Sequence, residues 1–168
     1  MRVLALTCAL SVFLVGPSAA QIVPLWRIVT DVTASICPLL VDGDLDAATR
    51  RAQEFEYRID NEARPHPEAV GATGRFVFLK GRHSDDMFLS VSEGMAWCAI
   101  SLPQSTPGSV ADVADPHLAA LGYARASTEA DRVSWTGDGR EASAFRTLEA
   151  QPRTTLALHF PYASHDQP

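Results

Sequence analysis

The 168-residue chain contains none of the short motifs that mark the commonest enzyme classes. It has no G-x-S-x-G nucleophile turn, no phosphate-binding P-loop, no H-E-x-x-H zinc motif and no glycine-rich dinucleotide turn after a strand. Basic residues are also scarce, 14 against 20 acidic ones, for a net charge of −6. An acidic surface repels phosphate backbones and anionic lipid, so we expect no nucleic-acid partner. Lysine is nearly absent, since Lys80 is the single one, and the other basic residues are arginines. This use of arginine, together with abundant alanine, indicates a GC-rich bacterial genome.

Long apolar runs are missing except at the start of the chain. Residues 1–20 have one positive charge at Arg2, an apolar run over residues 3–15, a Gly-Pro break and small residues up to Ala20. This pattern is typical of a secretory signal peptide cleaved after Ala20. The run is short of the roughly 20 residues that cross a bilayer, so we expect no stable membrane insertion after cleavage. Residues 21–168 are then one domain, periplasmic or secreted, and loss of Arg2 takes the net charge from −6 to −7.

Cysteine is scarce as well, with three residues in the chain. Because Cys8 lies in the signal sequence, Cys37 and Cys98 enter an oxidising compartment together, where two thiols usually pair. Neither has a second Cys or a His within four residues, which disfavours zinc, and no other feature calls for a metal or a cofactor. The apolar run around Cys98 is unlike the exposed, electropositive setting of a reactive thiol. The sequence predicts a Cys37–Cys98 disulfide, with two buried free thiols as the alternative.

Two helices are predicted in the first part of the mature chain. Apolar residues recur every four positions over residues 25–40, and Pro38 should kink or stop this helix near Ile36. Asp44 is placed to cap a second helix from Leu45 to about Ile59. Its outer face carries an arginine-rich charged group, most simply a solvated surface, made of Arg50, Arg51, Glu54 and Arg58.

A third helical region follows the loop at residues 103–109. Ser109 is a candidate cap, Asp115-Pro116 is expected to start a separate short helix, and Gly122 should end it.

The pattern changes to a period of two in two sets of three strands. The first set covers residues 75–80, 86–92 and 95–102, and the second covers 132–137, 141–150 and 154–160. Glu93-Gly94 and Asp138-Gly139 are hairpin turns. The strand at 95–102 is apolar on both faces, so we expect it to be central, with Cys98 toward the helices and Met95 and Trp97 on the other face.

These elements predict an α+β domain in the order α-α-β-β-β-α-β-β-β. We expect an antiparallel sheet of about six strands with helices packed on one face. The two halves fit a duplicated αβββ unit, although no repeat is visible residue by residue.

One short segment gathers a histidine and two carboxylates. "GRHSDD", residues 81–86, makes His83, Asp85 and Asp86 the candidate catalytic residues, because an imidazole near a carboxylate can relay a proton. The same residue types are ordinary turn formers, which is the simpler interpretation. The other histidines have ordinary explanations. His66 is a loop residue, and His117 fits the first turn of a short helix. His159 is a solvated, outward strand residue, and His165 lies in a tail.

The sequence favours a binding role over catalysis. If the helices leave one sheet face bare, Met95 and Trp97 become part of a groove for a partner or ligand. We therefore expect a non-enzymatic binding, inhibitor or envelope accessory domain whose partner is a protein, peptide or small ligand. The alternative is a small envelope hydrolase with a site assembled from residues far apart in the chain.

Overall fold

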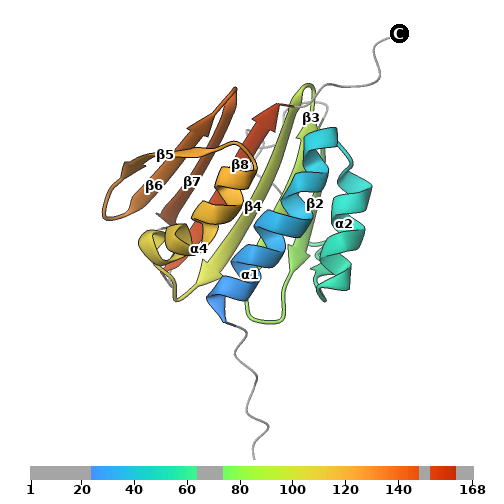
Figure 1. Ribbon diagram of the computed structural model, residues 1–168. Coiled ribbons are helices and arrows are strands. Elements are labelled where there is room, and N and C mark those ends of the chain that lie inside the picture. The colour runs from blue at the N-terminus through green and yellow to red at the C-terminus, as the bar shows by residue number, and fades with distance from the viewer. Residues whose placement is uncertain (1–23, 64–73, 148–151, 162–168) are drawn as a thin grey trace, which may run out of the picture.

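The computed structural model describes residues 24–63, 74–147 and 152–161. In these residues an antiparallel sheet of eight strands packs against three α-helices (Figure 1). The elements are α1 (Leu25–Asp31), a π-helical turn η1 (Val32–Ile36), a 3-10 turn η2 (Cys37–Asp42), α2 (Leu45–Glu54), β1 (Arg58–Ile59), β2 (Arg75–Lys80), β3 (Asp86–Ser92), β4 (Met95–Pro103), α4 (Pro107–Ala120), β5 (Ala124–Thr128), β6 (Arg132–Gly137), β7 (Arg140–Thr147) and β8 (Arg153–Pro161). Over the described ranges, every helix is too short or too polar to cross a bilayer.

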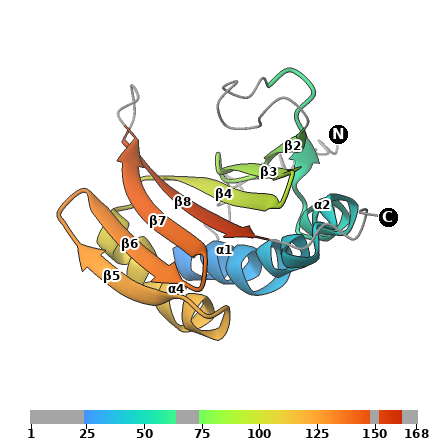
Figure 2. The same cartoon turned by 90° about the horizontal axis from the view of Figure 1, so that it is seen from above.

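Within residues 24–63, 74–147 and 152–161, helices lie on one face of the sheet only. Figure 2 shows α1, α2 and α4 on the same side of the sheet. On that side α2 packs on β2 and β3, η2 packs on β4, and α4 packs on β6, β7 and β8. We call the other side the open face. The α+β class and the placement of helices on one face are confirmed.

The two halves of the sheet have the same order of strand connections. Their order across the sheet is β1-β2-β3-β4-β8-β7-β6-β5, so each half is a four-stranded meander and the halves meet where β4 pairs with β8. Each meander follows a helix in the chain, the first after α2 and the second after α4. The sheet has eight strands rather than about six because β1 has two residues and β5 is exposed along its whole length. Neither carries the alternating apolar pattern by which strands are recognised in sequence.

The first two helical segments match their predicted starts better than their ends. Regular α-helix stops at Asp31, and a new 3-10 turn begins at Cys37 with Pro38 in its first turn, so the predicted break near Ile36 is confirmed. The Asp44 carboxylate accepts a hydrogen bond from the Ala47 N–H at 2.8 Å and caps α2. The prediction that α2 reaches Ile59 is wrong. The helix ends at Glu54, two residues before Glu56 takes a left-handed φ of 70°, and Ile59 lies in β1.

The third helix differs from its prediction at both Ser109 and Asp115. Thr106 is the N-cap of α4, and Ser109 completes a capping box three residues later. No second helix starts at Asp115-Pro116, since α4 runs through Pro116 to Ala120. Asp115 is engaged elsewhere, because its carboxylate accepts the indole N–H of Trp135 at 2.7 Å and pairs with Arg125. The predicted stop is confirmed at Gly122, whose φ is 85°.

A disulfide joins the helix layer to the centre of the sheet, as predicted. Cys37 of η2 and Cys98 of β4 are bonded, with their Cα atoms 5.5 Å apart and both residues fully buried. Around this bond lies the core between the helices and the sheet. Its largest fully buried side chains are Trp135, Phe160, Ile36, Leu40, Leu79, Met87, Leu89, Ile100, Leu102, Leu118, Leu156 and Leu158.

Candidate functional site

Strand register places a row of small side chains across the open face. Since side chains alternate between faces along a strand, residues paired across neighbouring strands share a face. The small residues that line up across β4, β8, β7 and β6 are Ala99, Ala157, Ser143 and Ser134. The next row on the same face has larger side chains, Trp97, His159, Glu141 and Thr136. Because the small residues stand beside larger ones, the open face is hollowed where they lie.

We call this depression over β6, β7 and β8 the open-face hollow. Its volume is about 250 Å³. It is lined by Arg132, Ser134, Trp135, Thr136, Glu141, Ala142, Ser143, Ala157 and His159. None of these was predicted as a site residue, and His159 was expected to be a solvated strand residue. The alternation of polar residues in β6 and β7 indicated an open face, but only the register brings them together with β8.

A stacked pair of rings forms one wall beside the hollow. The imidazole of His159 stacks on the indole of Trp97, with ring centroids 3.6 Å apart and planes inclined by 27°. His159 lies on the face opposite Leu158 and Phe160 as predicted, but it is half-buried rather than solvated. Burial lowers the pKa of His159, and the nearby Glu141 carboxylate only partly offsets this. The ring is therefore neutral at pH 7, with one nitrogen that donates and one that accepts.

Most of the polar side chains that line the hollow have no partner among the described residues, although the Ser134 hydroxyl lies 2.7 Å from the Ser127 hydroxyl. Among the described residues, the side chains of Arg132, Thr136, Glu141, Ser143 and His159 make no hydrogen bond or ion pair with one another or with another described residue. They are also open to solvent, because the described part of the chain has no buried side-chain nitrogen or oxygen without a partner. The hollow thus presents a set of free donors and acceptors next to aromatic rings.

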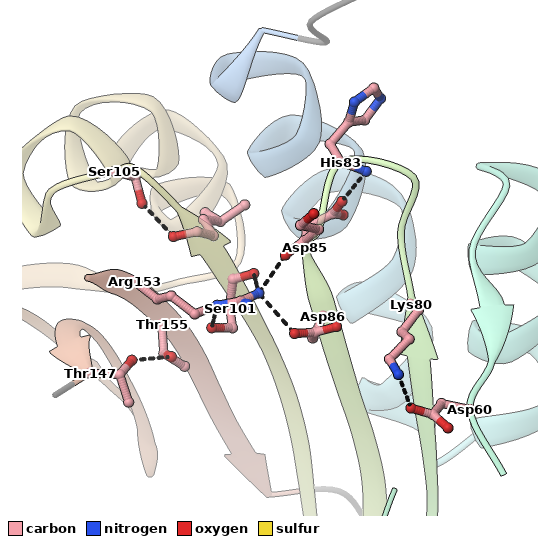
Figure 3. Close-up of polar contacts among 12 residues, drawn as sticks. Asp60, Lys80, His83, Asp85, Asp86, Ser101, Ser105, Thr147, Arg153 and Thr155 are labelled. Atoms are coloured by element: carbon pink, nitrogen blue, oxygen red, sulfur yellow. Dashed lines mark hydrogen bonds and ion pairs between the residues drawn. The ribbon is translucent and has the colours of Figure 1, made fainter. Parts of the chain in front are cut away.

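Two pairs of polar side chains elsewhere on the open face contact each other. Lys80 contacts Asp60 at 2.8 Å, and this hydrogen bond raises the pKa of Lys80 and lowers the pKa of Asp60. The hydroxyls of Thr147 and Thr155 are 3.1 Å apart (Figure 3).

Aromatic residues continue the open face over β2 and β3. Phe78 and Phe88 have centroids 4.9 Å apart, and Phe76 lies 6.1 Å from Phe78 and is 39% exposed. Met95 and Trp97, the predicted groove residues, lie on this same face and are half-buried. The rings pack against one another and remain partly exposed, so this part of the open face carries an apolar surface.

The predicted catalytic segment is a structural turn. Asp85 is 2% exposed, and its carboxylate accepts the Tyr57 hydroxyl and, at 3.1 Å, the backbone N–H of His83. Burial, and then the negative charge of Asp85, raise the pKa of Tyr57. The His83 ring points away from both carboxylates (Figure 3). Gly81 is required here because a Cβ at that position would collide with the Asp85 carboxylate.

Asp86 belongs to a different contact from Asp85. Its carboxylate pairs at 2.8 Å with Arg153, which also donates to the Ser84 carbonyl at 2.5 Å and to the Ser101 hydroxyl at 2.9 Å (Figure 3). These bonds tie β8 to β4 and to the turn before β3. His83, Asp85 and Asp86 are therefore close in sequence, but the structure does not bring them together as an acid–base group.

The remaining histidines and the charged face of α2 give no second candidate site. His117 lies in the last turn of α4, not the first turn of a short helix, and its ring nitrogen is 3.1 Å from the Thr30 hydroxyl. His66 and His165 lie outside the described residues. Arg51 pairs with Glu54 on the surface of α2. Within the described ranges, no group of three His, Cys, Asp or Glu residues is arranged to hold a metal ion.

Comparison with protein-family models, with curated proteins and with solved structures finds no match to this chain. The geometry of the open-face hollow is therefore the basis on which a function can be argued.

Proposed function

We propose that the protein is an exported, non-enzymatic binding domain that takes a small ligand in the open-face hollow. The observation that carries this proposal is the set of unengaged polar side chains beside the Trp97–His159 stack. Ligand sites are concave and combine apolar or aromatic residues with a few polar groups, and the hollow has His159, stacked on Trp97, beside Thr136, Glu141 and Ser143.

A small ligand suits this face better than a protein partner. Protein interfaces need a broad apolar centre, whereas the large apolar side chains exposed in the described residues lie on three separate elements: Trp26 on α1, Ile59 on β1 and Phe76 on β2. The hollow of about 250 Å³ is slightly below the roughly 300–1,000 Å³ typical of drug-sized ligands. It therefore fits a ligand of one or two rings.

Export is the second part of the proposal. The Cys37–Cys98 disulfide supports it, because such bonds persist in oxidising compartments. The composition of residues 1–20 supports a signal peptide cleaved after Ala20. Intact-mass measurement of protein from the envelope or the medium is expected to show a chain that begins at Gln21 and has no thiol free to react. Full-length protein in the cytosol would contradict export.

Photocrosslinking in living cells tests whether the hollow is occupied. A Thr136→benzoylphenylalanine variant places the reactive group in the hollow, and a Gln53→benzoylphenylalanine variant places it on α2, on the other side of the sheet. After irradiation, the variant at Thr136 is expected to gain an adduct of small-molecule mass, and the control at Gln53 is not. A protein adduct at Thr136, or equal adducts at both positions, would refute small-ligand binding in the hollow.

A hydrolase is the second candidate, because Glu141, Ser143 and His159 line the same hollow. A nucleophilic serine needs a base within about 2.6–3.2 Å. His159 instead stacks on Trp97 and makes no hydrogen bond to Ser143 or Glu141, which favours binding. A fluorophosphonate probe that labels serine hydrolases is expected to leave Ser143 unmodified, and stoichiometric labelling there would reverse the order of the two candidates.

A further inference from the structure

We infer that the ligand of the open-face hollow is a neutral saccharide; this rests on the proposed function and names its ligand class. The inference starts from where charge lies in the hollow. Arg132 and Glu141 are exposed at its rim, and the more recessed Ser143 and His159 are neutral, as is Ser134, whose hydroxyl is bonded to that of Ser127. One positive and one negative charge leave the hollow balanced, so it has no net preference for an anion or a cation.

The recessed groups suit a ligand that both donates and accepts hydrogen bonds. A serine hydroxyl and a neutral imidazole each have one donor and at least one acceptor. Sugar hydroxyls have the same double capacity, so each can meet whichever group it faces. An acyl chain or another apolar ligand would cover Ser143 and His159 without replacing their bonds to water, which is unfavourable.

The backbone of the hollow argues against an extended peptide. Strands β6, β7 and β8 are interior strands, paired on both sides, so their N–H and C=O groups are already used in the sheet. A peptide laid across them cannot add to the sheet, and its own backbone groups would meet the methyl groups of Ala99 and Ala157. A saccharide directs its polar groups outward around a ring and leaves apolar C–H faces for such a floor.

The aromatic wall completes the fit. Trp97 lies beside the hollow through its stack on His159, and its indole N–H has no hydrogen-bond partner among the described residues. Aromatic rings have electron-rich faces that attract the slightly positive C–H groups of a sugar ring. The aromatic residues of β2 and β3 extend the surface away from the hollow, so an oligosaccharide longer than one ring has further contacts on the open face.

Titration followed by nitrogen-15 NMR tests the inference. The probes are the neutral trimers maltotriose, cellotriose and chitotriose, each up to about 10 mM, which is ten times a Kd of about 1 mM. At least one trimer is expected to shift the amides of residues 132–143 and 157–159 in a saturable way. Ser143→Ala is expected to weaken that binding about tenfold, as loss of a hydrogen bond to the ligand predicts, and Glu141→Gln, which replaces a charged acceptor by a neutral one, is expected to weaken it by a smaller factor. Both residues are at least partly exposed, so both variants are expected to fold.

Matched controls separate this inference from the proposed function. Glu54→Gln makes the same change on α2, across the sheet from the hollow, and should leave the affinity unchanged. If no trimer shifts the hollow, or if the shifts fall on α2, the saccharide inference is wrong. If N-acetyl-trialanine amide or a free amino acid shifts residues 132–143 and the trimers do not, the hollow binds a different ligand class. In that case the proposed function stands and the saccharide inference fails.

Discussion

The Cys37–Cys98 disulfide is expected to supply a large part of the stability of the fold. The two residues are 61 positions apart, so the bond closes a long loop in the unfolded chain. In the chain-entropy treatment, a loop of this length stabilises the folded state by about 4 kcal/mol, which is a substantial fraction of the 5–15 kcal/mol typical of a domain. At about 2–4 °C per kcal/mol for a chain of this size, loss of the bond should lower Tm by about 10 °C.

The assay compares the same chain with and without the bond. Guanidinium unfolding of the wild-type protein is followed with and without reductant, so that only the cross-link differs. A Cys37→Ala/Cys98→Ala variant should have a free energy of unfolding about 1–2 kcal/mol below that of the reduced protein. The further loss is expected because both cysteines are fully buried and their sulfur atoms leave space behind. The reasoning is refuted if the midpoints with and without reductant coincide, or if the denatured wild-type protein takes up two alkyl groups.

Three further predictions concern single side chains. Tyr57→Phe removes a donor from the buried Asp85 carboxylate and should lower the free energy of unfolding by about 1–3 kcal/mol in a guanidinium titration. His83→Ala should change it by less than roughly 0.5 kcal/mol, because the contact to Asp85 comes from the backbone of His83, and a larger loss would show that the ring matters. The pKa of His159 is lowered in the folded state, so the unfolded chain takes up its proton first as pH falls through about 6.5. The free energy of unfolding should therefore decrease as pH falls through this window, and His159→Gln, measured in parallel, should decrease less.

Much of the sheet could be predicted from sequence because its signals are local. Turn residues such as Gly94 and Gly139, both with positive φ, define hairpins between strands whose apolar residues alternate. Cys37 and Cys98 could be paired because they are the two cysteines that remain once Cys8 is placed in the predicted signal peptide. The end of α2, the unbroken α4 and the strands β1 and β5 were missed. The unbroken α4 depends on a tertiary contact, because Asp115 bonds to Trp135 instead of starting a helix, and β1 and β5 lack an apolar alternation in the sequence.

The site was less predictable than the fold. Met95 and Trp97 could be placed on the face away from the helices, because β4 alternates regularly. The hollow itself depends on how β6, β7 and β8 are aligned, and a shift of one residue would send Ser143 and Glu141 to the other face. "GRHSDD" attracted attention because its residues are adjacent in sequence, yet adjacent residues in a turn point in different directions. Residues that share a site here come instead from different strands.

The pairing of β4 with β8 also constrains how the protein reaches its native state. It joins residues 95–103 to residues 153–161, so the middle of the sheet closes only after the last strand has been synthesised and delivered. Until then β4, with apolar residues on both sides, is an unprotected edge on which other chains can assemble. Closure over such a separation is also slow, which lengthens the period of exposure. A chain that crosses a membrane unfolded passes through this stage at its destination, where a chaperone that shields residues 95–103 would increase the yield of folded protein.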